Sequence, residues 1–166
     1  MLQEPPVHGP ELDPAEVLGM VGLAAADADP ALPCQVVATG VPQVLACVAD
    51  PDALARAEPD YERIGALLAR HDAIVLYLAA VEPDTGRARA RSFLATAEGG
   101  EDPATGAAAG PLCAHVAARS GVECLEIAQG VEMGRPSLPR AALEADRVRV
   151  GGDAVILGEG VVHLDG

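Results

Sequence analysis

The stretch from Gly99 to Gly121, GGEDPATGAAAGPLCAHVAARSG, constrains the fold more than any other part of the chain. Its run of Ala and Gly predicts a closely packed helix, because small side chains let neighbouring backbone come near. Asp102 is a preferred N-cap residue and Pro103 suits the first helical position, so we expect the helix to begin there and to end at Ser120-Gly121. An anion or another backbone segment can come close to the positive end of such a helix.

The composition indicates one domain with a core of small aliphatic residues. The chain has 166 residues, of which 50% are hydrophobic, with no Trp, one Phe and two Tyr. The net charge of −14 disfavours binding to nucleic acid or to anionic membrane surfaces. Ten carboxylates between Met1 and Asp60 are opposed by one basic residue, Arg56. We interpret them as a solvated acidic surface in preference to a docking surface.

The four cysteines do not form a metal-binding pattern. They show no C-x-x-C pair and no His at ligand spacing, so we expect no metal site. We interpret each as a small buried hydrophobic residue: Cys34, Cys47, Cys113 and Cys124. The chain shows neither a signal peptide nor an apolar run of about 18 residues, which predicts a cytoplasmic protein without a membrane role.

Turn and capping signals divide the rest of the chain into short elements. Three prolines predict an extended lead-in without secondary structure over residues 1–12, followed by a single domain over residues 13–166. Helices are expected at Asp13-Pro14, at Asp50-Pro51 and over residues 60–70. Strands are expected over residues 34–38, 44–48, 73–79, 87–93, 123–128, 147–150, 154–157 and 161–164. The first two should form a hairpin, and the lack of regular helical crossovers excludes a doubly wound α/β fold.

The segment RARARSF, residues 87–93, gives the clearest strand signal because Arg alternates strictly with small residues. The alternation places Arg87, Arg89 and Arg91 on one face. We favour a solvated sheet face for them over ion pairs with the acidic first third of the chain or contact with a partner.

Glu101 and Asp102 are the candidate titratable pair, since both lie at or just before the expected helix start. A carboxylate at Asp102 suits an N-cap, a proton acceptor or an orienting group, and spacing alone favours the cap. The backbone N–H groups of Thr105, Gly106 and Ala107 are candidates for holding a substrate carboxylate, as helix starts do for anions. Taken alone, this is a weak signal.

Other catalytic arrangements are not visible in the sequence. His115 lies on the expected buried helix, and we interpret it as a core residue. There is no G-x-S-x-G motif, and the chain has no Lys for a phosphate-binding loop. Hydrolase and nucleotide-binding functions are therefore not expected.

Several segments together resemble the PhzF-like family of phenazine-biosynthesis proteins. Arg91-Ser92-Phe93 followed by EDPATGAAAGPL, residues 101–112, is similar to one family signature, and QGVEMGRPS, residues 129–137, is similar to a second. Residues 148–155 resemble the closing strand pair of the family, and residues 39–42 a shared turn. The resemblance covers nearly the whole chain.

The resemblance implies an α+β fold in which a mixed, mostly antiparallel sheet wraps around one central helix. This would be one half of a diaminopimelate-epimerase-like fold, with the active site between two halves. The family moves a proton between carbons of small carboxylated metabolites, without a metal or other cofactor. Asp102 would be the catalytic carboxylate. The substrate-binding residues would be Glu101, Thr105, Gly106 and Ala107.

Two departures from the family qualify this interpretation. Ala107 stands where the family usually has Ser, so a hydroxyl group is lost. The chain also resembles only the C-terminal half of the family, whose general acid/base Glu and supporting His lie in the N-terminal half. Residues 1–6 resemble the segment that enters the second half.

The missing counterpart leaves one favoured function and two alternatives for the chain. We expect an isomerase or epimerase half whose site is completed by a separate N-terminal half or by self-association, with the isolated monomer inactive. The first alternative is a non-catalytic binding or scaffold module that keeps the fold without turnover. The second is that the chain is a fragment of a longer protein.

Overall fold

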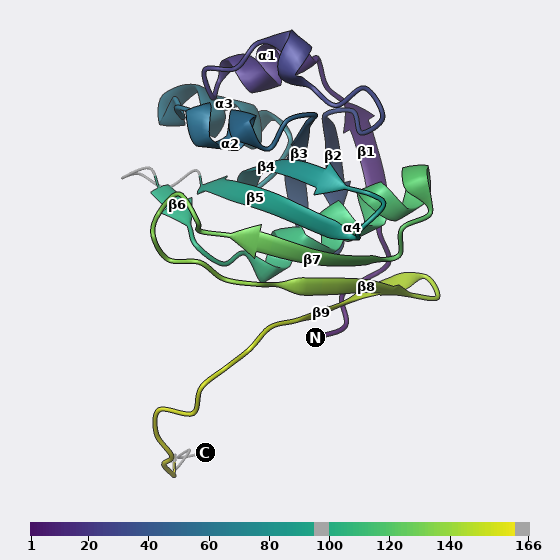
Figure 1. Ribbon diagram of the computed structural model, residues 1–166, viewed down its shortest axis with the longest axis vertical. Helices are drawn as coiled ribbons and strands as arrows, with labels where there is room; N and C mark the ends of the chain where they lie inside the picture. The colour runs from purple at the N-terminus through teal and green to yellow at the C-terminus, as the bar shows by residue number, and fades with distance from the viewer. Residues whose placement is uncertain (95–99, 162–166) are drawn as a thin grey trace.

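In the computed structural model, which describes residues 1–94 and 100–161, nine strands form one curled sheet (Figure 1). One 15-residue helix runs along the inner face of the curl, and three shorter helices cover part of its outer face. The predicted α+β class, with a sheet wrapped around a central helix, is confirmed.

The bounds of the elements are as follows. The strands are β1 (Val7–Glu11), β2 (Gln35–Ala38), β3 (Pro42–Val48), β4 (Val75–Glu82), β5 (Arg87–Leu94), β6 (Gly100–Asp102), β7 (Cys124–Gln129), β8 (Arg140–Glu144) and β9 (Arg147–Gly151). The helices are α1 (Pro14–Gly19), α2 (Asp52–Arg56), α3 (Tyr61–Arg70) and the inner helix α4 (Gly106–Ser120), with a 3-10 turn at Ala25–Asp27.

The sheet is mixed, and most neighbouring strands run antiparallel. Its order is β1-β2-β3-β4-β5-β7-β8-β9, with β6 paired to β5; β3–β4 and β5–β7 are parallel pairs. Residues 1–3 run beside β9, where the Met1 ammonium donates to Val150 O (2.6 Å) and the Gln3 N–H donates to Val148 O (2.9 Å). Because the same segment continues into β1, it joins the two ends of the sheet around α4.

Side chains of the central strands divide between two cores. On β4, Leu76 and Leu78 pack with α1–α3 on the outer face, whereas Val75 and Tyr77 pack against α4. A strand covered on both faces carries apolar residues at every position. This explains why residues 73–79 read as a continuous apolar run.

Helix α4 fits inside the curl because many of the residues that it buries are Ala, Gly or Cys, which are small. At Gly110 an added Cβ would lie 1.7 Å from Gln3 Oε1, so the Gln3 side chain occupies the space that a larger residue would need. Gln3 Oε1 accepts from the Thr39 hydroxyl (2.6 Å), and Gln3 Nε2 donates to Gly106 O (3.0 Å). The N-terminal segment, the sheet and the start of α4 are therefore tied together.

Most of the predicted elements are present in the structure. The hairpin is β2–β3, and the strands expected near residues 73–79, 87–93, 123–128 and 147–150 are β4, β5, β7 and β9. Asp13 and Asp60 cap α1 and α3 with their side chains. Gly121 ends α4 in the left-handed conformation, with a φ of 75°.

The predicted start of the central helix is wrong. Asp102 is not the N-cap and Pro103 is not the first helical residue, since α4 begins at Gly106 and its N-cap position is Thr105. The reason is a long-range pairing: residues Gly100–Asp102 form β6 against β5, so the backbone of Asp102 belongs to the sheet. Gly99 lies outside the described residues.

Both ends of the chain also depart from the predictions. Residues 7–11 of the expected unstructured lead-in form β1, because their backbone pairs with β2. Residues 154–157 were expected to form a strand, but they are exposed and pair with no described segment. The strand expected over residues 161–164 lies outside the described residues except for Val161. Strand β8, with the sequence RAALE, is not signalled in the sequence because it lacks β-branched residues.

Three of the four cysteines are buried, as predicted. Cys124 is instead exposed at the start of β7, because alternate residues of this strand point outward. Burial raises the pKa of the Cys34 thiol to about 11. Within residues 1–94 and 100–161, no cluster of His, Cys, Asp or Glu could hold a metal ion, and no helix is long and apolar enough to cross a bilayer.

His115 is fully buried on α4, as predicted for a core residue, and it contacts Arg119. Arg119 Nη1 lies 3.1 Å from His115 Nδ1. Because Arg only donates, Nδ1 accepts and the neutral ring carries its proton on Nε2. Burial, and next the charge of Arg119, lower the pKa of His115 to about 4.

We expect the protein to lose stability as the pH falls from about 6.5, the usual pKa of an unfolded His, towards about 4. In this range the unfolded chain binds a proton at His115 and the folded chain does not, so the free energy of unfolding drops, by up to about 3 kcal/mol. Urea unfolding at pH 7 and pH 4.5 should show a smaller drop for His115→Leu than for the wild type. His71→Gln is the control, and an equal drop in His115→Leu would rule out this role.

Candidate functional site

Asp102 lies where two strands share one edge of β5. Strand β7 pairs with β5 as far as Gln129, which is opposite Ala90, and β6 pairs with β5 further along, where Asp102 is opposite Ser92. The ends of β6 and β7 therefore meet beside β5. This brings Asp102 and Gln129, which are 27 positions apart in the sequence, into contact.

The side-chain amide of Gln129 holds this junction together. Its Nε2 donates to Asp102 O (2.6 Å) and to Thr105 Oγ1 (2.9 Å), and its Oε1 accepts from the Tyr77 hydroxyl (2.8 Å) and the Thr105 N–H (3.2 Å). The Thr105 hydroxyl donates to Asp102 Oδ2 (2.7 Å), and the Ala104 N–H donates to Oδ1 (3.3 Å). The Asp102 carboxylate is thus oriented by the loop that leads into α4.

Gln129 and Tyr77 are fully buried. Burial, and next the negative charge of Asp102, raise the pKa of Tyr77 well above its ordinary value. Tyr77 therefore stays a neutral hydrogen-bond donor to Gln129 at any physiological pH.

The Gly-rich loop of residues 130–137 packs against Pro103. The Ser137 hydroxyl donates to Pro103 O (2.6 Å), and Gln129 and Ser137 exchange two backbone hydrogen bonds. Gly130 has a φ of 74°, and an added Cβ would lie 2.4 Å from Arg135 O, so glycine is required there. The segments EDPATG and QGVEMGRPS therefore form one structural unit.

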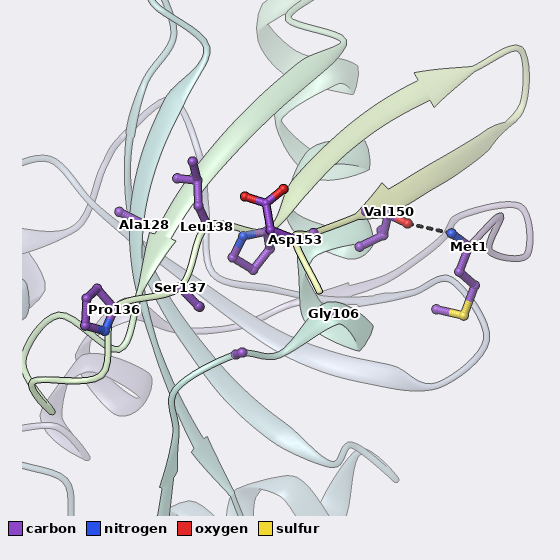
Figure 2. A pocket seen from close by; sticks show the side chains of 12 residues that line it. Met1, Gly106, Ala128, Pro136, Ser137, Leu138, Val150 and Asp153 are labelled. Carbon is purple, nitrogen blue, oxygen red and sulfur yellow. Dashed lines mark hydrogen bonds between the residues drawn. The ribbon is translucent and has the colours of Figure 1, made fainter. Parts of the chain in front are cut away.

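An open hollow of about 930 Å³ lies beside the start of α4 (Figure 2). Ala104 and Gly106 are among its lining residues. The other lining residues are Met1, Ala128, Pro136–Pro139 and Val150–Asp153. Asp102 is half-buried two positions before Ala104 and is not itself among the lining residues. The lining residues are mostly small or apolar, with Asp153 as the one carboxylate among them.

The N–H groups of Gly106 and Ala107 are the first of α4, so no carbonyl within the helix pairs with them. They make no hydrogen bond within the described part of the chain, whereas the Thr105 N–H is donated to Gln129. Gly106 lines the hollow and Ala107 is exposed. Of the three amides predicted to hold an anion, these two are therefore open to a ligand, and their role in binding stays a prediction.

Glu101 points to the other face of the sheet, where it pairs with Arg91. Arg91 Nε and Nη2 each donate to one carboxylate oxygen of Glu101 at 2.8 Å, and Arg91 Nη1 donates to Leu54 O and Ala57 O, both at 2.8 Å. Both side chains are about nine-tenths buried, with exposures of 10% and 11%. The solvated face favoured for the arginines is therefore wrong for Arg91, because α2 and the segment after it cover this part of the sheet.

The structure does not bring the five predicted site residues together in one cluster. Asp102 and Thr105 are hydrogen-bonded, Gly106 and Ala107 lie at the start of α4, and Glu101 is engaged by Arg91. The proposed roles of all five stay predictions.

Sequence reasoning missed the side chains that support Asp102, namely Tyr77, Gln129 and Ser137. Gln129 is a polar residue that ends a strand just before a glycine, and this position could have marked it as a candidate site residue. Tyr77 stands inside an apolar run and gave no signal.

Comparison with known proteins identifies relatives over most of the chain. The family model described as phenazine biosynthesis-like protein (PhzC-PhzF) matches residues 1–160. The trans-2,3-dihydro-3-hydroxyanthranilate isomerase of Pseudomonas fluorescens is 35% identical over 158 residues, and that of Pseudomonas chlororaphis is 36% identical over 157 residues. Each alignment covers 90% of this chain and 53% of the relative. The chain thus spans about half the length of these curated relatives.

Solved structures show the same fold. A PhzF-family phenazine biosynthesis protein of Bacillus anthracis matches with a TM-score of 0.77 at 22% identity, over 92% of this chain and 56% of that one. A protein of Pseudomonas aeruginosa described as a predicted epimerase matches with a TM-score of 0.72 at 28% identity, over 96% of this chain and 58% of that one.

Glu101→Gln should destabilise the fold by about 3 kcal/mol, because it leaves the Arg91 guanidinium buried without its counter-charge. Glu126→Gln is the matched control, since Glu126 pairs with Arg140 where both side chains are about half exposed, at 50% and 47%. That change should cost less than about 1 kcal/mol. Urea unfolding measures both, and equal losses would show that burial of the Arg91 pair does not matter.

Proposed function

Because the chain belongs to the PhzC-PhzF family of phenazine biosynthesis-like proteins, we propose that it forms one wall of an isomerase site. The reaction is a proton shift between two carbons of a small carboxylated substrate, and it needs no cofactor. The opposite wall comes from a second half-domain, either a separate N-terminal half or another copy of this chain.

The observation that carries the proposal is the orientation of Asp102 beside the start of α4. The carboxylate is half-buried and held at both oxygens by the loop of residues 103–105. Such a group can accept a proton from carbon or deliver one. In the shift, a C–H bond breaks, its electron pair enters a new double bond, and the carbon at the far end of the old double bond gains a proton, so the composition of the substrate is unchanged.

The hollow and the relatives support the proposed substrate class. The curated relatives are named for trans-2,3-dihydro-3-hydroxyanthranilate, which carries a carboxylate. The free N–H groups of Gly106 and Ala107, at the positive end of a 15-residue helix, suit that carboxylate. Ala107 offers no hydroxyl, so this chain holds the anion through backbone groups.

Two features of the chain support a second half-domain. The hollow beside α4 is open, and acid–base chemistry needs groups positioned on both sides of the substrate. Residues 152–161 leave the body from the rim of this hollow (Figure 1). Their apolar side chains Val155, Ile156 and Leu157 are 81% to 95% exposed, and the family model continues through residue 160.

Ala107 favours a second candidate function, a binding or scaffold module without turnover, because the hydroxyl that the family usually has at this position is absent. The two candidates differ in what they require of Asp102. A scaffold needs the shape of the loop, whereas an isomerase needs the carboxylate.

Asp102→Asn should lower kcat at least 100-fold for trans-2,3-dihydro-3-hydroxyanthranilate, because the amide is not a useful base. The protein assayed is this chain assembled with the N-terminal half of the Pseudomonas fluorescens relative. The fold should be kept, since the Asn oxygen still accepts from Thr105.

Asp84→Asn, at an exposed turn, is the control and should retain wild-type kcat. Full activity of Asp102→Asn would exclude the catalytic role. An assembled but inactive wild-type complex would favour the scaffold.

A further inference from the structure

The side-chain amide of Gln129 has only one possible orientation. The Thr105 N–H can only donate and the Asp102 carbonyl can only accept, so Oε1 must face the first and Nε2 the second. Two backbone groups therefore fix the positions of the oxygen and nitrogen atoms of the Gln129 amide. Every further hydrogen bond of this buried amide follows from that orientation.

The direction of each proton in the network is then determined. Because Gln129 Oε1 accepts, Tyr77 must donate to it (2.8 Å). Because Gln129 Nε2 donates to Thr105 Oγ1 (2.9 Å), the Thr105 hydroxyl is free to give its own proton to Asp102 Oδ2 (2.7 Å). The chain of donors runs from Tyr77 through Gln129 and Thr105, and it ends on the carboxylate.

We propose that Tyr77 and Gln129 are positioning residues for the proton shift, an inference that rests on the proposed function. They aim the Thr105 hydroxyl at Asp102 Oδ2, which keeps that oxygen a hydrogen-bond acceptor. Oδ1, whose partner is the longer contact from Ala104 N–H (3.3 Å), is then the oxygen that meets the substrate.

The location of the two residues suits this task. Tyr77 lies within β4 and Gln129 at the end of β7, and both are fully buried. A site whose orienting groups stand on rigid strands holds its geometry better than one built from loops alone. The loop of residues 103–105 is tied to these strands at Thr105 through the Gln129 amide.

Tyr77→Phe is the sharpest test, because it removes one hydroxyl and keeps the ring. Ser92→Ala is its matched control: Ser92 lies between Tyr77 and Asp102 in the β-ladder, is fully buried, and its hydroxyl has no hydrogen-bond partner within the described residues. Both variants lose a buried hydroxyl group from the same face. Only Tyr77→Phe breaks the donor chain.

In the assembled protein, Tyr77→Phe should lower kcat about tenfold with KM within about twofold of wild type, since orientation of the carboxylate acts on the chemical step. Ser92→Ala should change neither parameter by more than about twofold. Gln129→Glu, which puts an acceptor against Asp102 O and removes the donor to Thr105, should lower kcat further.

A second readout does not depend on turnover. In the 166-residue chain, solvent exchange of the Gln129 side-chain NH₂ and the Thr105 N–H, followed by NMR, should be at least about tenfold faster in Tyr77→Phe than in wild type or Ser92→Ala.

The two readouts separate failure of the inference from failure of the proposed function. Unchanged kcat and unchanged exchange in Tyr77→Phe would overturn the inference, as would equal losses in Ser92→Ala. An inactive wild-type assembly would overturn the proposed function, and the exchange rates alone would then decide whether Tyr77 and Gln129 orient Asp102.

Discussion

The close packing of α4 inside the curled sheet is the constraint on which the rest of the structure depends. The N-terminal segment closes the sheet around the helix, because residues 1–3 run beside β9 while residues 7–11 pair with β2. Where this segment crosses α4, the Gln3 amide takes the space that a side chain at position 110 would occupy. The same amide binds Gly106 O, so closure of the sheet also fixes the start of the helix.

The alternation of side chains along a strand gives two adjacent carboxylates different roles. Glu101 and Asp102 stand next to each other in β6, so they point to opposite faces of the sheet. Glu101 neutralises the buried Arg91 on the outer face, while Asp102 joins the network of Thr105 and Gln129 beside α4. One short strand thus contributes a structural ion pair and, in the proposed reaction, the group that moves the proton.

Local signals in the sequence predict much of this fold. Asp13 and Asp60 mark helix starts, Gly121 marks a helix end, and the alternation in RARARSF marks β5. These features depend on a few neighbouring residues, so the sequence contains them directly. The resemblance to the PhzF-like family then singles out Asp102, which spacing alone interprets as a helix cap.

Contacts that depend on pairing between strands far apart in the sequence could not be predicted. The start of α4 is displaced from Asp102 to Gly106 because β6 pairs with β5, and no local signal reports that pairing. Alternation identifies the face that carries Arg91 but does not say which helices cover it. Gln129 becomes the support of Asp102 only because β6 and β7 share one edge of β5.

The central claim is that Asp102 moves a proton only when a second half-domain faces it. The direct measurement follows trans-2,3-dihydro-3-hydroxyanthranilate in D₂O by NMR, with this chain alone, with the N-terminal half of a relative alone, and with both. The account predicts conversion of the substrate to its isomer in the mixture of the two halves, and with this chain alone only where a size measurement shows self-association. Conversion by the monomeric chain, or no conversion in a mixture that a size measurement shows to be assembled, would contradict it.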